Sequence, residues 1–215
     1  MSQQHPRGGA DGHSAVGAAA VQERLERRTR QIMETPRPAA DPGAAEREKA
    51  VVHECRYLMR LLSTRRRSAG EMRERLARRE VPAAVAHEAM ARIDRAGLID
   101  DAAFARDWVQ QRRELRALGD AALRRELEQR QVADVHIDAA LGTDRSEEED
   151  RCRELVRSRI SERDREQLRT ERDGGHRRRL SRRLDALLTR KGYPGDLAVQ
   201  VISGELRAAA QQRGR

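Results

Sequence analysis

One motif occurs three times along this 215-residue chain, and it constrains the fold more than any other feature. Each copy is built around a leucine. An apolar residue lies four positions before it, a cation three positions after it and a second apolar residue fourteen positions after it. The copies are Met72, Leu76, Arg79 and Met90; Leu123, Leu127, Arg130 and Leu141; and Leu184, Leu188, Lys191 and Ile202. The motif leucines lie 51 (127 minus 76) and then 61 (188 minus 127) residues apart. Such self-similarity predicts a tandem array with one small helical unit per copy, which offers a long surface rather than a pocket.

The apolar residues between the motif positions follow helical spacing, and no segment alternates convincingly with period two, so we expect an all-α protein. We divide the chain into a disordered N-terminal tail (1–46), unit 1 (47–99), unit 2 (100–146) and unit 3 (147–209), each unit a three-helix repeat. Proline and glycine break the pattern near residues 36–43, and a helix is conceivable only over 18–33 of the tail. Unit 3 is expected to begin with one long charged helix over 147–172.

Capping signals and apolar stripes place the helices within the units. Ser68 and Glu71 form the pattern of a capping box, and Asp100 is a predicted N-cap. Phe104, Trp108, Val109 and Leu115 are expected to form the apolar face of the first helix of unit 2. Phe104 and Trp108 could instead stack on bases, but their four-residue spacing favours a place in the core.

Composition limits the classes of function. Charged residues make up 38% of the chain, aromatic residues 2%, and the net charge is +9. A positive excess fits an anionic partner such as nucleic acid or a nucleoprotein. The scarcity of aromatic residues disfavours a protein that binds single strands by stacking alone.

No pattern for catalysis, metal binding or membrane insertion is evident. Cys55 and Cys152 stand far apart, and His53 near Cys55 lacks further ligands, so we expect neither a disulfide framework nor a metal site. Asp100-Asp101 resembles a catalytic carboxylate pair but is better explained as helix capping. We therefore expect a cytoplasmic monomer that is not an enzyme, with no cofactor, signal peptide or membrane span.

Basic clusters are the candidate binding residues. They would contact DNA phosphates or acidic protein surfaces, whereas the alternative is a solvated face or a favourable place at a helix C-terminus. The candidates are Arg65, Arg66, Arg67, Arg78, Arg79, Arg130, Arg177, Arg178, Arg179, Arg182, Arg183, Arg190 and Lys191. Arg65-Arg66-Arg67 is predicted to be a basic turn between two helices.

Three segments resemble a known family. The segment 97–109, GLIDDAAFARDWV, resembles the signature at the first repeat junction of the RecX family. The upstream residues Ser68, Glu71 and Leu76 and the later segment 187–193, LLTRKGY, also resemble that family. The resemblance covers roughly residues 50–206.

The resemblance implies three tandem three-helix repeats in an elongated, curved molecule. It also implies a regulator of the RecA recombinase that binds along the RecA–single-stranded-DNA filament and suppresses its ATPase, strand-exchange and co-protease activities. In this reading the chain acts in recombination, DNA repair and the SOS response. Two alternatives stay open: direct contact with the DNA strand within the filament, and a stand-alone single-stranded nucleic-acid-binding protein.

Overall fold

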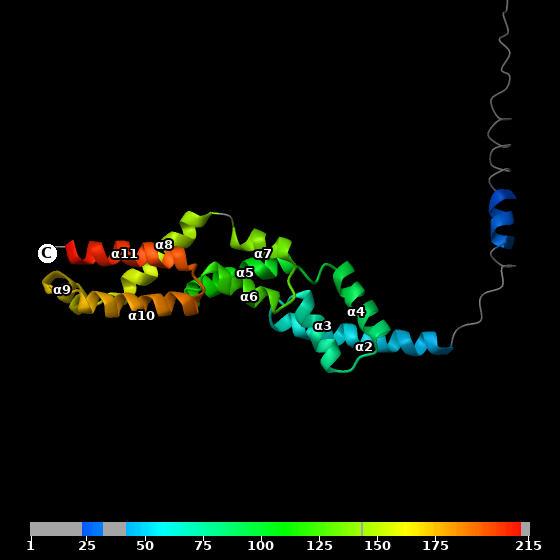
Figure 1. Ribbon diagram of the computed structural model, residues 1–215. Helices are drawn as coiled ribbons and strands as arrows, with labels where there is room; N and C mark the ends of the chain where they lie inside the picture. The colour runs from blue at the N-terminus through cyan, green and yellow to red at the C-terminus, as the bar shows by residue number, and fades with distance from the viewer. Residues whose placement is uncertain (1–22, 32–41, 143, 212–215) are drawn as a thin grey trace, which may run out of the picture. The chain divides into compact units, whose positions relative to one another are not determined.

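The computed structural model describes residues 23–31, 42–142 and 144–211, and every regular element within these ranges is an α-helix (Figure 1). The expectation of an all-α protein is therefore confirmed. Residues 23–31 are helical, within the span of the tail that the sequence allows to form a helix. Residues 1–22 and 32–41 of the expected disordered tail lie outside the described residues. The expectation is wrong for residues 42–46, which form the first turn of α2, because Pro42 opens the helix instead of breaking it.

Unit 1 contains α2 (Pro42–Thr64), α3 (Ala69–Arg78) and α4 (Ala83–Arg95). Its buried cluster is made of Val51, Leu58, Met72, Leu76, Val85, Ala89 and Ile93. Ser68 caps α3 as predicted, because its side chain accepts a hydrogen bond from the backbone N–H of Glu71. The Glu71 carboxylate does not complete the capping box; it binds Arg65 instead.

Unit 2 contains α5 (Asp101–Arg116), α6 (Asp120–Glu128) and α7 (Asp134–Leu141). Phe104, Val109, Leu123, Leu127 and Ile137 are among its buried residues. The expectation that Leu115 joins this face is wrong, since its side chain is 71% exposed. It lies in the last turn of the 16-residue α5, where Arg113 contacts α6 and α7 and the Arg116 carbonyl oxygen accepts from Lys191, whereas Leu115 lies on the solvent-exposed side.

Unit 3 contains four helices: α8 (Arg145–Arg159), α9 (Glu162–Thr170), α10 (Gly175–Lys191) and α11 (Gly195–Gln211). The long helix expected over 147–172 is thus wrong. Ile160 is extended, and Ser161 starts α9 with a complete capping box to Asp164. The additional helix accounts for the wider spacing of the third motif. One buried cluster lies in each of the three units, although the unit boundaries themselves stay a proposal.

The three units share one backbone feature after the helix that carries the motif leucine, which is α3 in unit 1, α6 in unit 2 and α10 in unit 3. The residue four places after the motif leucine is left-handed in each: Glu80 (φ 56°), Gln131 (φ 54°) and Gly192 (φ 84°). A left-handed conformation costs a residue other than glycine roughly 1 kcal/mol, so a shared tight turn must be stabilised by its surroundings. The sequence motif therefore corresponds to a repeated structure.

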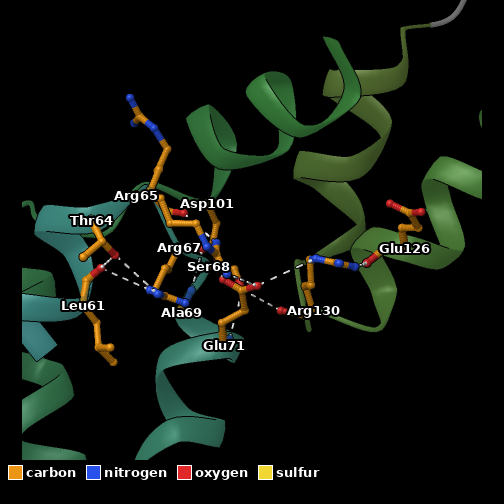
Figure 2. Close-up of polar contacts among 11 residues, drawn as sticks. Leu61, Thr64, Arg65, Arg67, Ser68, Ala69, Glu71, Asp101, Glu126 and Arg130 are labelled. Carbon is orange, nitrogen blue, oxygen red and sulfur yellow. Dashed lines mark hydrogen bonds and ion pairs between the residues drawn. The ribbon is translucent and has the colours of Figure 1, made fainter. Parts of the chain in front are cut away.

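The junction of units 1 and 2 joins the start of α3 to the C-terminal turn of α6 (Figure 2). The Ser68 hydroxyl donates to the Arg130 carbonyl oxygen at 2.7 Å, and the Ala69 N–H donates to the Asp101 carboxylate at 2.8 Å. Only glycine fits at position 70, because a Cβ there would lie 2.3 Å from the Arg130 carbonyl oxygen. One hydroxyl thus caps a helix and binds the next unit.

The junction of units 2 and 3 repeats this arrangement. The Gly119 N–H donates to the Lys191 carbonyl oxygen at 2.9 Å, and the Asp120 N–H donates to the Glu148 carboxylate at 2.9 Å. A Cβ on Gly119 would lie 2.7 Å from the Gly192 carbonyl oxygen. The start of α3 thus binds a carbonyl just after α6 and a carboxylate on α5, and the start of α6 binds a carbonyl at the end of α10 and a carboxylate on α8.

Candidate functional site

The arginines of the turn 65–67 are all bound within the chain. Arg65 makes two hydrogen bonds of 3.0 Å to the Glu71 carboxylate, and Arg66 Nε lies 3.0 Å from Asp107 Oδ2 in unit 2. Arg67 donates to a backbone carbonyl near the end of α2 at 3.2 Å (Figure 2). The residues form a turn as predicted, but they help to fix the start of α3 and its contact with unit 2.

Arg130 belongs to the same junction. Its guanidinium lies 3.7 Å from the centre of the Trp108 ring, and that of Arg112 lies 4.1 Å from the same ring. Glu126 accepts from Trp108 Nε1 at 2.8 Å and from Arg112 Nε at 2.9 Å. Glu71 lies 3.8 Å from Arg130 Nε. Burial lowers the pKa of the Arg130 guanidinium. Trp108 therefore packs at the edge of the core, as predicted, and is covered by cations.

The cations at the end of α3 also have partners. Arg79 pairs with the buried Glu54 at 3.2 Å and lies over the Tyr57 ring at 4.2 Å. Arg78 pairs with Glu74, one turn earlier in the same helix. These contacts match the structural interpretation of a cation near a helix C-terminus.

Three predicted residues on α10 differ in their surroundings. Lys191 donates to the Arg116 carbonyl oxygen of unit 2, and Arg183 lies 3.3 Å from Asp164 Oδ2. Arg190 is exposed and forms no ion pair within the part of the chain that the structure describes. Lys191 is thus a junction residue, whereas Arg190 stays accessible to a partner.

Unit 3 brings the other predicted arginines together. Arg177, Arg178 and Arg182 of α10 line a hollow of about 710 Å³ with Arg207 of α11. All four are exposed, and within the described ranges none of them forms an ion pair. Arg179 is also exposed but does not line the hollow. Arg178 lies near the Asp173 carboxylate, whose pKa it helps to lower, and Arg207 donates to the Ser203 carbonyl oxygen, but within the described residues neither side chain forms an ion pair.

Two acidic residues that precede α10 in the sequence bind the backbone N–H groups of its first turn. The Glu171 carboxylate accepts from the backbone N–H groups of His176 and Arg177, and Asp173 accepts from that of Gly175 at 3.1 Å. The N-terminus of the helix is therefore already capped, and the arginine side chains beside it remain available.

The described residues contain no arrangement that suggests catalysis. No group of three His, Cys, Asp or Glu residues among them could hold a metal ion. Asp100 accepts from the Ala103 N–H at 2.8 Å, a bond that lowers the pKa of its carboxyl, and Asp101 binds Ala69 across the junction. Both are capping groups, as predicted. No helix in the described ranges is long and apolar enough to cross a membrane.

Comparison with known proteins decides the family. The family models of the first and second three-helix domains of RecX match residues 56–92 and 100–141. The regulatory protein RecX of Mycobacterium tuberculosis is 38% identical over 173 residues, which cover 80% of this chain and 95% of the relative. The chain belongs to the RecX family. The regulatory protein RecX of Mycobacterium avium is 36% identical over 179 residues, or 83% of this chain and 95% of the relative.

Solved RecX structures share the fold. The crystal structure of a regulatory protein RecX superposes with a TM-score of 0.61 at 18% identity and covers 79% of each chain. The RecX of Lactobacillus salivarius gives 0.61 at 16% identity and covers 75% of this chain and 99% of its own. This RecX-family chain is therefore built from the helical repeats that the sequence indicates.

Sequence reasoning missed part of the hollow. Arg207, Ser181 and Ser203 contribute to it but stand outside the basic runs. The repeat spacing could have found them, since Ser203 lies one residue after a motif position and Arg207 one turn later. The pairing of Arg66 with Asp107 had no such signal, because those residues are 41 positions apart (107 minus 66).

Proposed function

We propose that this RecX-family chain regulates the RecA recombinase, and that it inhibits it by binding along the RecA–single-stranded-DNA filament. The observation that carries the proposal is family membership across four fifths of the chain with relatives named as regulatory proteins. The repeated junctions support it, because an array of equivalent units suits a partner that itself repeats. Bound along a filament, one chain would span several recombinase subunits and lower ATP hydrolysis, strand exchange and co-protease activity.

The proposed regulator acts as a cytoplasmic monomer without a cofactor and without catalysis of its own. The groups that support binding on its described surface include the exposed arginines of unit 3, while the junction arginines hold the units together. Arg190 and Arg179 extend the exposed positive surface of α10. Such a surface attracts the anionic filament and accelerates encounter with it.

A second candidate function is stand-alone binding of single-stranded nucleic acid. The unmatched arginines of unit 3 favour it, because they suit phosphates whether or not a recombinase is present. The two functions differ in what the chain needs. A regulator requires recombinase contacts in addition to the strand, whereas a stand-alone module binds the bare strand equally well.

Co-sedimentation separates the two functions. The chain is centrifuged with four samples: cognate RecA on single-stranded DNA, RecA alone, single-stranded DNA coated by an unrelated single-strand-binding protein, and DNA alone. The proposal expects the chain in the pellet with the RecA filament at concentrations where it stays in the supernatant of the unrelated nucleoprotein. Equal recovery from both nucleoproteins and from bare DNA would favour the stand-alone module.

A further inference from the structure

Each unit carries a hollow beside the helix that bears its motif leucine. The hollow lies between α3 and α4 in unit 1, beside α6 and α7 in unit 2, where Glu148 and Pro194 of unit 3 also line it, and between α10 and α11 in unit 3. The hollows have volumes of about 700 Å³ in unit 1, 670 Å³ in unit 2 and 710 Å³ in unit 3. Two repeat positions line all three: Ala69, Asp120 and Ser181 at the first, and Met90, Leu141 and Ile202 at the second. Their offsets equal those of the motif leucines, 51 (120 minus 69) and 61 (181 minus 120). The hollows are therefore one feature of the repeat, present three times.

The chemistry of the three hollows differs. The hollow of unit 1 is mostly apolar, with Leu76, Val81 and Ile99 in its lining. The hollow of unit 2 mixes signs, and its Arg124 pairs with Asp138. The hollow of unit 3 contains four arginines, two serines and no carboxylate. Only the third is an anion site by composition.

Arg177, Arg178 and Arg179 repeat the triplet Arg65, Arg66 and Arg67 at a sequence offset of 112 (177 minus 65). The two triplets have different surroundings, because that of unit 1 lies in the turn before α3 and does not line the hollow of unit 1, whereas that of unit 3 lies within α10. The triplet of unit 1 is bound by carboxylates and a backbone carbonyl. The triplet of unit 3 has no ion pair in the described part of the chain. Arg207 of the hollow of unit 3 donates to the Ser203 carbonyl oxygen at 3.1 Å, and Arg178 interacts with Asp173, so these contacts offset only part of the repulsion among the four gathered cations.

We infer that the hollow of unit 3 binds the phosphodiester backbone of a single nucleic-acid strand, whatever its bases. Guanidinium and serine hydroxyl groups line it, and both donate hydrogen bonds to phosphate oxygens. No aromatic side chain lines it, so stacking on bases is absent from this contact.

An acidic peptide fits the hollow less well. A protein partner is normally anchored by apolar or aromatic side chains that enter a pocket. Here the apolar lining is Ile202 and Leu206, whose own exposures are 3% and 2%, so little apolar surface is left to cover. The apolar hollow of unit 1 has the opposite character. A strand whose charges are all negative matches the hollow of unit 3 more closely than a protein surface of mixed sign.

The inference rests on the proposed function for its setting, since the strand it names is that of the recombinase filament, but the contact belongs to this chain alone. The test measures fluorescence anisotropy of a labelled oligo-dT strand as the chain is added, over a range of NaCl concentrations. Three proteins are compared: the wild-type chain, the double variant Arg178→Gln/Arg182→Gln, and the control Arg124→Gln/Arg125→Gln. The control removes the same charge from the equivalent hollow of unit 2.

Each lost phosphate contact reduces the slope of log affinity against log salt by about 0.7 on single strands. The slope of the double variant should therefore be shallower by about 1.4. If the double variant and the wild-type chain bind equally at 1 M salt, the double variant should bind about 25-fold more weakly at 0.1 M salt. The control should match the wild-type chain in slope. Circular dichroism of both variants should stay helical, because Arg125, Arg178 and Arg182 are exposed and Arg124 is held by a surface ion pair with Asp138, which contributes little to stability.

Three results would overturn the inference: a wild-type chain that does not bind the strand, a double variant with the slope of the control, or a double variant that loses filament binding and keeps strand binding. The last result would assign the hollow to carboxylates of a protein. A wild-type chain that binds the strand through the hollow and yet shows no preference for the recombinase filament would instead contradict the proposed function and leave the inference standing.

Discussion

Gly70→Ala tests how the units are joined. An ideal Cβ at position 70 would lie 2.3 Å from the Arg130 carbonyl oxygen and 2.4 Å from Gln131 Cβ. Neither atom is the end of a flexible side chain, since both belong to the tight turn that ends the second helix of unit 2. The start of α3 must therefore move away from unit 2, and the 2.7 Å hydrogen bond from Ser68 to that carbonyl is lost.

The magnitude follows from three contributions. Overpacking a tight contact costs about 1–3 kcal/mol, and a lost hydrogen bond costs about 1 kcal/mol. The higher helix propensity of alanine offsets at most about 1 kcal/mol. The net expectation is a loss of about 1–3 kcal/mol in the free energy of unfolding.

Gly204→Ala is the matched control. Gly204 lies inside α11, and no atom stands within 4 Å of an ideal Cβ there. The same substitution should stabilise the chain at this position, by about 0.5–1 kcal/mol.

The assay is urea unfolding followed by circular dichroism and by fluorescence of Trp108, the single tryptophan of the chain, which lies against Arg130. The Gly70 variant should unfold at lower urea than wild type, with the fluorescence transition at least as strongly affected as the helical signal. A Gly70 variant as stable as the Gly204 variant would refute the proposed contact between the units.

Two further predictions concern unit 3 and the thiols. Ser161→Ala should destabilise α9 by about 1 kcal/mol, because it removes an N-cap that is part of a complete capping box; amide exchange in α9 should speed up, and unchanged protection there would contradict the assignment of the break at Ile160. Burial raises the pKa of the Cys152 thiol to about 11, so a thiol reagent should label Cys55 first and Cys152 only as the chain unfolds; rapid labelling of a Cys55→Ser variant in native buffer would show that the core of unit 3 opens readily.

Much of the fold could be predicted because the repeat motif reports local structure. Leu76, Leu127 and Leu188 are each 1% exposed or less, and the tight turn after each of them is the same. Ser68 and Asp100 cap the helices that their sequence patterns indicate. These features depend on residues a few positions apart, and such spacing is visible in a single sequence.

Two expectations were wrong because a local sequence pattern does not show which of two possible structures the rest of the chain favours. Ser161 and Asp164 form a capping-box pattern, yet the surrounding charged residues suggested one continuous helix. Leu115 has the right spacing for the core, but it lies on the solvent-exposed side of the last turn of α5, a turn in which Arg113 and Arg116 contact the neighbouring helices. In both cases the outcome is settled by packing.

The roles of the basic residues could not be separated by sequence. Arg65–Arg67 and Arg177–Arg179 are identical triplets at the same sequence offset, but the first lies in the turn before α3 and the second within α10. The first triplet forms ion pairs with Glu71 and Asp107, one of them in another unit, whereas the second forms no ion pair within the described residues. Tertiary contacts therefore decide which cations are structural and which are available to a ligand.

The most direct test of the proposed regulation is the rate of ATP hydrolysis by cognate RecA on single-stranded DNA, with this chain titrated in. An array that spans several subunits of a filament should lower the rate when there is less than one chain per RecA subunit. Unchanged hydrolysis at a twofold excess of the chain would contradict the proposal that it inhibits the recombinase.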